Sequence, residues 1–311
     1  MKKIRTLLSF LSLLLLAASC IGPDLEANWE DMPESDFTEQ LNVMAVISLD
    51  RANPSLVAVH KTLPLTGPES VWAGRDTVWY GEGPDDYWND ERYESLYAVH
   101  GATVIISDGI NSFEFHEPSE ADTTWEKLKW AEEALYVDTL GLFSPQPMTT
   151  YTLEVVAPEG HVITGEVTTP PIPAINGEGL PDTLEQRKPF TLSWTLDHDT
   201  RTAVWTQALN YWLCGADQYA IMPANTREWT SEVENCSDWY LGEGNEPDSI
   251  LIEVRAMDEN YYDYFVRYGS GDDFSSFALG QGSSIRSVGV EGGIGVFCAI
   301  ATDRIYRIFK P

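Results

Sequence analysis

The chain has 311 residues, of which 49 are Asp or Glu and 19 are Lys or Arg, so its formal net charge is −30 at pH 7. A charge of this sign and size excludes a nucleic-acid-binding function, because phosphates are bound by patches of Lys and Arg. It also disfavours adsorption to anionic lipid. The length is that of two ordinary domains.

The first twenty residues have the layout of a bacterial lipoprotein signal. A basic start precedes an apolar run over residues 7–18, and Ala17-Ala18-Ser19 leads directly to Cys20. This order is typical of a secretory signal, and the Cys at the cleavage point resembles a lipobox. We therefore predict that residues 1–19 are removed and that an acylated Cys20 anchors the protein to a membrane. The alternatives are an ordinary cleavable signal and an uncleaved anchor helix, for which the apolar run is short.

Residues 20–40 are rich in Gly, Pro, Asp, Glu and Ser, so we expect a flexible acidic tether. No Asp follows Cys20, so the inner-membrane retention pattern of enterobacterial lipoproteins is missing. We expect the outer membrane instead, with the folded part facing the periplasm or the cell surface. The acidic residues after the Cys resemble the surface-export signals of Bacteroidota lipoproteins.

Residues 41–172 are expected to form a first β-sandwich domain. Short alternating or apolar runs between turn residues predict strands over residues 41–49, 55–61, 102–107, 112–116, 151–155 and 162–168. One segment departs from this pattern. Thr123-Thr124-Trp125-Glu126 has the form of a capping box, and apolar residues follow at helical spacing as far as Leu135, which predicts a short helix.

A proline-rich link marks the domain boundary at residue 172. Pro170, Pro171 and Pro173 cannot continue a central strand, because proline donates no backbone N–H. A second domain over residues 173–311 is predicted to contain strands at 190–196, 204–213, 249–256, 261–268, 294–300 and 304–309. The expected fold class is all-β, with two antiparallel β-sandwiches of the immunoglobulin or fibronectin type III kind, in which Trp194 fills a core.

Three cysteines follow Cys20. Cys298 lies in an apolar run, so we expect a buried thiol that behaves as a small hydrophobe. Cys214 and Cys236 are left as a candidate disulfide, which would close a loop of about 22 residues and stabilise the fold by on the order of 3 kcal/mol. Two reduced thiols are the alternative, since pairing cannot be read from sequence.

Five short motifs occur in a particular order along the chain. They are A-x-V-x-I-x-D at Ala102–Asp108, Y-x-L-x-V at Tyr151–Val155, T-x-P at Thr168–Pro170, a Tyr-rich strand at Asp258–Tyr264, and G-G-x-G-x-F at Gly292–Phe297. In this order they resemble the Bacteroidota lipoprotein family catalogued as domain of unknown function 4249 (DUF4249). The resemblance implies an envelope lipoprotein that is often found alongside TonB-dependent outer-membrane receptors, with no established catalytic residues.

The sequence carries no recognisable catalytic motif. The five histidines are scattered, and there is no H-E-x-x-H, no zinc spacing of cysteines and no G-x-S-x-G elbow. Carboxylates are too abundant for any pair to be nominated as acid and base. We expect a protein that is not an enzyme, with no catalytic residue and no cofactor.

The best candidate for binding is a loop over residues 79–93, where aromatic residues stand beside carboxylates. Trp, Tyr and Arg dominate the hot spots of protein interfaces. The same mixture suits a glycan, whose apolar faces stack on rings. A third interpretation places half of the rings in the core and the acids in solvent. The candidate residues are Trp79, Tyr80, Tyr87, Trp88, Arg92 and Tyr93.

Two acidic segments are candidates for calcium ligands. Asp197-His198-Asp199 and Gly271-Asp272-Asp273 supply oxygen atoms, but neither has the spacing of an EF-hand loop. No metal site is therefore predicted.

These features favour a lipid-anchored envelope lipoprotein of a binding or accessory type. Its expected partners are the membrane, through acylated Cys20, and an outer-membrane β-barrel receptor of a TonB-dependent transport system. The alternatives are a glycan-binding surface module and a structural or adhesive envelope protein.

Overall fold

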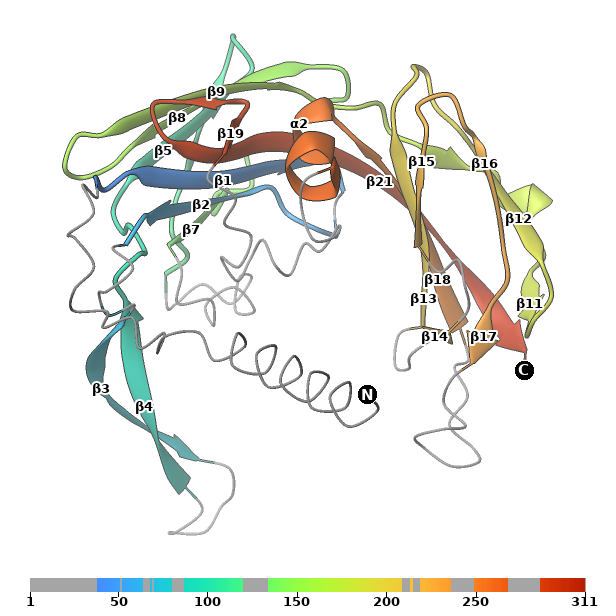
Figure 1. The fold of residues 1–311 in the computed structure, drawn as a ribbon, viewed down its shortest axis with the longest axis horizontal. Coiled ribbons are helices and arrows are strands. Elements are labelled where there is room, and N and C mark those ends of the chain that lie inside the picture. Colours follow the sequence, from blue (N-terminus) through green and yellow to red (C-terminus); the bar gives the residue numbers. More distant parts are fainter. Residues whose placement is uncertain are drawn as a thin grey trace, which may run out of the picture. The chain divides into compact units, whose positions relative to one another are not determined.

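The computed structural model describes residues 38–50, 52–63, 68, 70–79, 87–119, 134–208, 213–214, 219–235, 249–267 and 286–310. The chain divides into two compact units, residues 1–38 and 39–311, and every described helix and strand belongs to the second (Figure 1). Among the described residues, no helix is both long enough and apolar enough to cross a membrane.

One mixed sheet organises residues 39–311. Its order is β15-β13-β18-β21-β1-β2-β7, with β11 and β19 also pairing with β21. Most neighbours are antiparallel, but β1, β11 and β19 run parallel to β21. The strands are β1 (Leu41–Ser48), β2 (Leu56–Lys61), β7 (Leu135–Val137), β11 (Thr183–Glu185), β13 (Thr202–Ala208), β15 (Tyr219–Met222), β18 (Ser249–Met257), β19 (Ser287–Val288) and β21 (Ile294–Lys310).

A second sheet covers one end of the first and forms what we call the N-terminal lobe. Its order is β20-β9-β8-β5-β6. Alternate residues of β1, including Val43, Ala45 and Ile47, share a buried core with Leu153 and Phe297. The strands are β5 (Thr103–Ser107), β6 (Ser112–Phe115), β8 (Thr150–Val156), β9 (Val162–Thr168) and β20 (Val290–Glu291).

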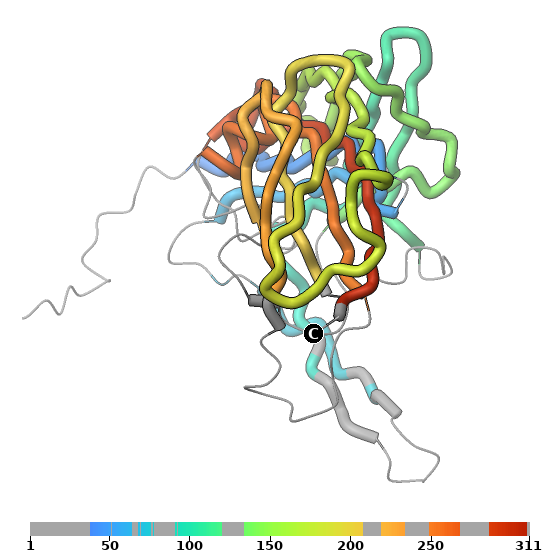
Figure 2. Tube along the Cα trace, turned by 90° about the vertical axis from the view of Figure 1, so that its right-hand side faces the viewer, coloured from blue at the N-terminus to red at the C-terminus, as the bar shows by residue number. Residues whose placement is uncertain are grey.

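A third sheet, β10-β12-β16, covers the other end and forms the C-terminal lobe. Trp194 is buried in its core together with Leu192, Ile252 and Phe309, so the predicted role of this Trp is confirmed. Figure 2 views this lobe from the side, with its yellow and orange strands in front of β1 and β2. The elements are β10 (Ala174–Ile175), η3 (Gly177–Gly179), β12 (Phe190–Thr195), β16 (Glu228–Ser231) and the pair β14 (Leu213–Cys214) and β17 (Glu234–Asn235).

The long strand β21 belongs to both lobes. It has 17 residues, with Phe297 and Ala299 in the N-terminal core and Phe309 in the C-terminal core. The predicted all-β sandwich class is confirmed. The link at residue 172 does run between the lobes, but the N-terminal lobe also takes β20 and the first half of β21 from beyond it. The two lobes are therefore not two successive segments of the chain.

The prediction of a strand over residues 261–268 is wrong. Glu259–Tyr261 form the helix α2, which continues as the wider helical turns of η5 over Tyr262–Arg267. The carboxylate of Asp258 caps this helix by accepting the backbone N–H groups of residues 260 and 261. The apolar residues 261, 264 and 265 have helical spacing and cover the second face of β1 and β21. The Tyr-rich motif is thus a helix.

Three further expectations concern segment type. Residues 120–133, which include most of the predicted short helix, lie outside the described residues, and Leu135 begins the strand β7. The strand predicted over 204–213 runs over Thr202–Ala208 as described. The prediction of a loop over residues 79–93 is also wrong in part. Its described residues, 79 and 87–93, belong to the strands β3 and β4.

The glycines of the terminal G-G-x-G-x-F motif permit the parallel pairing of β21 with β1. Gly295 has a φ of +118°, and a Cβ there would collide with the carbonyl oxygen of Val43. A Cβ at Gly293 would lie 2.7 Å from the carbonyl oxygen of Leu41. The motif therefore serves the fold, because only glycine lets the two backbones approach so closely.

Candidate functional site

The candidate binding stretch forms a two-stranded ribbon. Strands β3 (Ser70–Trp79) and β4 (Tyr87–Ser95) pair with each other and with no other described strand (Figure 1). The chain after β4 returns to the sheet, where Lys61 N donates to Tyr97 O at 2.8 Å and Val99 N to Val59 O at 3.0 Å. A two-stranded hairpin is at best marginally stable by itself.

The register of the ribbon contains one irregularity. Trp72 lies opposite Tyr93, and Gly74 lies opposite Arg92, so Ala73 is an additional residue in β3. Gly74 has a φ of +146°, which glycine adopts readily. Bulges of this kind twist a ribbon and redirect its side chains.

Four described side chains form what we call the ribbon cluster: Trp72, Arg75, Glu91 and Tyr93. Trp72 is 61% exposed and Tyr93 is 42% exposed. Glu91 accepts a hydrogen bond from Arg75 Nη2 at 3.0 Å and another from the Tyr93 hydroxyl at 3.0 Å. One carboxylate thus holds a guanidinium and an aromatic ring side by side at the surface.

The hydrogen bonds within the ribbon cluster shift the pKa values of Glu91 and Tyr93. The hydrogen bonds from Tyr93 and then from Arg75 lower the pKa of the Glu91 carboxyl. The same hydrogen bond to Glu91 raises the pKa of the Tyr93 hydroxyl. At neutral pH the cluster therefore presents an ionised carboxylate, a cation and two exposed rings.

The structure brings together only some of the predicted residues. Tyr93 lies in the ribbon cluster, Trp79 lies opposite Tyr87, and Trp88 lies opposite Val78. Tyr80 and the side chains of Trp79, Tyr87, Trp88 and Arg92 lie outside the described residues.

Trp72 and Arg75 were missed by the sequence prediction, because the candidate stretch began at residue 79. The signal that could have found them is the hairpin itself. Turn residues at Gly81–Asp86 separate two runs that each contain Trp and Arg. Pairing across that turn brings the first run opposite the second.

The predicted cysteine sites remain predictions. Cys20, Cys236 and the side chain of Cys214 lie outside the described residues, although the backbone of Cys214 pairs with Glu234 in the β14–β17 pair. Cys298 is fully buried, as its apolar context predicted, and its thiol donates to Ala45 O at 3.5 Å.

The acidic segment near residue 198 is held by an arginine. Arg227 Nη2 donates to His198 O at 3.1 Å and lies 3.4 Å from Asp199 Oδ1. In the part of the chain that the structure describes, no three His, Cys, Asp or Glu side chains converge as metal ligands. Gly271-Asp272-Asp273 lie outside that part.

A histidine and a carboxylate meet where the chain before β5 approaches the chain after β6. His100 Nδ1 lies 2.6 Å from Glu117 Oε2, while Glu117 Oε1 accepts from Gly101 N at 2.7 Å and from the Tyr136 hydroxyl at 2.9 Å. Burial raises the pKa of Tyr136 well above its ordinary value. These contacts tie the chain before β5 to the chain after β6, which is a structural role.

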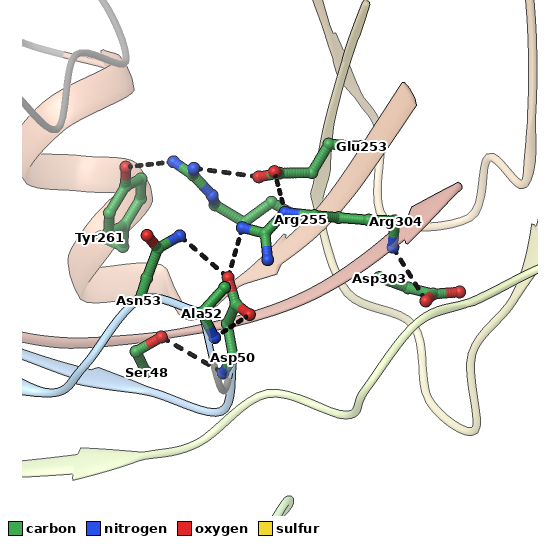
Figure 3. Close-up of polar contacts among 9 residues, drawn as sticks. All are labelled: Ser48, Asp50, Ala52, Asn53, Glu253, Arg255, Tyr261, Asp303 and Arg304. Carbon is green, nitrogen blue, oxygen red and sulfur yellow. Dashed lines mark hydrogen bonds and ion pairs between the residues drawn. The ribbon is translucent and has the colours of Figure 1, made fainter. Parts of the chain in front are cut away.

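A second charged cluster, the junction network, lies where the lobes share β18 and β21 (Figure 3). Glu253 accepts hydrogen bonds from Arg255 at 3.1 Å and from Arg304 Nε at 2.6 Å. Arg304 also pairs with Asp50, in the turn between β1 and β2, and Arg255 donates to the Tyr261 hydroxyl at 3.2 Å. Burial opposes the charge on Arg304, but Asp50 and Glu253 raise its pKa.

Comparison with known proteins supplies one family. A family model described as "Domain of unknown function (DUF4249)" matches residues 30–305. No curated protein sequence matches the chain. Among solved structures, the chain is similar to the FN1–FN3 domains of chicken CNTN1, with 12% sequence identity and a TM-score of 0.24, over 83% of this chain and 78% of that chain.

Proposed function

The chain belongs to the DUF4249 family, and we propose that it is a lipid-anchored outer-membrane lipoprotein that binds a protein partner through its β3–β4 ribbon. The partner that fits the proposed location is a β-barrel receptor of a TonB-dependent transport system. In this proposal the acylated Cys20 and the acidic residues 20–40 hold the folded part near the membrane, and the ribbon makes the contact.

The observation that carries the proposal is the exposure of the ribbon cluster. Trp72 and Tyr93 contribute little to any core while they remain in solvent, yet they lie beside a paired Arg and Glu. Trp, Tyr and Arg are the residues that contribute most to binding energy when a partner buries them. The ribbon also exposes strand edges, to which another strand can add.

A glycan is the second candidate for the same surface. An exposed indole supplies a stacking platform, and the neighbouring Glu91 and Arg75 supply an acceptor and donors for sugar hydroxyls. This alternative needs only the ribbon. It is tested by quenching of Trp fluorescence with a panel of oligosaccharides.

The first experiment is recovery of tagged full-length protein from gently solubilised envelopes, followed by mass spectrometry. We expect a stoichiometric β-barrel protein with the native chain and its loss with the double variant Trp72→Ala/Tyr93→Ala. Tyr306→Ala is the matched control, because Tyr306 is 56% exposed but lies on β21. Cys20→Ala tests the anchor separately.

Three outcomes would contradict the proposal. Equal recovery of the partner with the ribbon variant would show that the contact lies elsewhere. Recovery of the lipoprotein alone, together with saturable quenching by one oligosaccharide, would favour the glycan module. If neither a partner nor a glycan is found, the structural or adhesive alternative gains.

A further inference from the structure

A group of exposed aliphatic side chains lies at one end of the N-terminal lobe, away from the ribbon in sequence. Leu140 and Leu142, in the loop after β7, are 66% and 67% exposed. Three more apolar side chains are exposed: Met148 just before β8, Ile172 in the proline-rich link after β9, and Ile110 in the turn between β5 and β6. We call these five residues the apolar tip.

The loop that carries the apolar tip is firmly held from beneath. The ring of Phe143 lies 5.1 Å from that of Phe113 and 5.5 Å from that of Tyr151. Phe143 N donates to Asp138 Oδ2 at 2.5 Å, and Gln146 N donates to the Tyr151 hydroxyl at 2.9 Å. Leu140 and Leu142 are therefore exposed on a loop whose backbone and ring contacts hold it in place.

The backbone at Met148 adds to this picture. Its φ is +54°, in the left-handed region that non-glycine residues seldom adopt, and its N–H donates to Thr169 O at 3.1 Å. Such conformations persist where the surroundings enforce them, and they are common at binding sites. The loop thus keeps a bulky apolar residue in a position where glycine would be less strained.

Charge is distributed unevenly around the apolar tip. Residues 139–153 carry no charged side chain, although 22% of the whole chain is charged. Residues 130–186 contain no Lys or Arg, whereas the sheet beside the tip carries Glu114, Glu154 and Glu166. The loop that carries most of the tip is therefore uncharged, and the sheet beside it is acidic. The centres of protein interfaces are typically depleted of charged residues.

A pocket of about 420 Å³ opens beside the apolar tip. Its lining includes Gly141, Phe143 and Ile172, together with the carboxylates of Asp50 and Asp138. Asp50 is neutralised by Arg304. Within the described residues Asp138 has no ion-pair partner, so a cation from outside would find a carboxylate at the edge of an apolar pocket.

We propose that the apolar tip docks a second protein, whose contact surface has an apolar centre and a Lys or Arg that enters the pocket beside Asp138. An anionic lipid surface does not fit, because the acidic sheet beside the tip would repel it. A symmetric contact between the tips of two copies does not fit either, because residues 130–186 offer no Lys or Arg. The contact is separate from the proposed ribbon site and does not depend on it.

The pocket lies at the C-terminal end of β1. Ser48 and Leu49, at the end of β1, line the pocket, whereas Leu41, at the start of β1, adjoins the predicted tether. A strand of this length spans about 23 Å. The pocket thus lies at the opposite end of β1 from Leu41.

The test places a photo-crosslinking residue, benzoylphenylalanine, at position 142 of the full-length chain in native envelopes. We expect one crosslinked protein that is not this chain, and a crosslinked peptide that contains apolar residues next to a Lys or Arg. The matched control carries the same residue at position 308, since Ile308 is 59% exposed on β21. No crosslink to the same protein is expected there.

Two further variants test the chemistry of the contact. Leu140→Ser and Asp138→Asn, each combined with the crosslinker at position 142, are expected to lower the yield about tenfold, corresponding to the loss of roughly 1.4 kcal/mol. The Asn side chain keeps an acceptor for Phe143 N, so Asp138→Asn preserves the loop. Trp72→Ala/Tyr93→Ala should leave the yield unchanged, which separates this site from the ribbon.

Four outcomes would overturn the proposal. They are crosslinks to lipid, crosslinks to a second copy, the absence of any crosslink from position 142, and a yield that Asp138→Asn does not change while circular dichroism shows a native fold.

Discussion

The ribbon cluster and the junction network are built from the same chemical groups in opposite surroundings. Each joins Arg to Glu and adds a Tyr hydroxyl. The Glu253 carboxylate is nearly inaccessible, with the residue only 3% exposed, whereas Glu91 is exposed. Exposed ion pairs contribute about 0–1 kcal/mol to stability, but removing one partner of a buried pair costs about 3–5 kcal/mol.

The comparison teaches which of the two clusters is available for function. The junction network is satisfied internally and joins the turn after β1 to β18, β21 and α2, so its charges hold the lobes' shared sheet. The ribbon cluster contributes little to stability where it stands. Its rings remain available to a partner.

The largest effect is expected from Glu253→Gln. The change removes the carboxylate that pairs with both Arg255 and Arg304, while Arg304 keeps its pair with Asp50, so the free energy of unfolding should fall by about 3–5 kcal/mol. Urea unfolding followed by fluorescence measures the change. Glu91→Gln is the matched control and should leave the same quantity nearly unchanged, because solvent screens an exposed pair. Similar losses of stability in both variants would show that the junction network does not stabilise the fold more than the ribbon cluster does.

A change of intermediate size is expected in the pH dependence of stability. Two buried groups, His60 and Asp258, should change the free energy of unfolding in opposite directions as pH rises. Burial lowers the pKa of His60 from 6.5 to about 4, so the stability that neutral His60 contributes is lost as pH falls from 6.5 towards 4. Burial raises the pKa of Asp258 from 3.8 to about 7, although residues 260, 261 and 299 donate backbone N–H groups to it. The stability that protonated Asp258 contributes is lost as pH rises from about 4 to 7.

The contributions of His60 and Asp258 to the free energy of unfolding change with pH in opposite directions. Replacing one residue should therefore reveal the pH dependence that the other contributes. Relative to the native chain, His60→Gln should lose stability as pH rises from 4 to 6.5, by on the order of 3 kcal/mol, while Asp258→Asn should gain it. Unfolding midpoints across this pH range test both. His161→Gln, at an exposed position, is the control. If stability changes with pH in the same way in all variants, His60 and Asp258 do not cause the pH dependence.

The smallest effect is local to the ribbon cluster. Because the hydrogen bond to Glu91 raises the pKa of the Tyr93 hydroxyl, Glu91→Gln should return that pKa towards its ordinary value. Isotope-labelled tyrosine and NMR titration measure it at this one residue. If the pKa of Tyr93 is the same in both chains, the hydrogen bond does not form in solution.

The sequence by itself determined the features that arise from local pattern. Alternation of apolar residues predicted β5, β8, β9 and β12, and an apolar run predicted the burial of Cys298. These predictions succeed because a strand with one buried face must repeat every two residues. The order of short motifs likewise predicted the family.

Only the tertiary structure decided the features that depend on residues far apart. The helix over residues 259–267 packs against strands that include β1, and its capping residue Asp258 also accepts the N–H of Ala299 on β21. The junction network joins Asp50 to Arg304, and the ribbon cluster depends on a register that no single strand encodes. In the apolar tip, Phe143 packs against the core and is half-buried, whereas its neighbour Leu142 is exposed. Exposure is a property of the packed chain, so a local pattern cannot specify it.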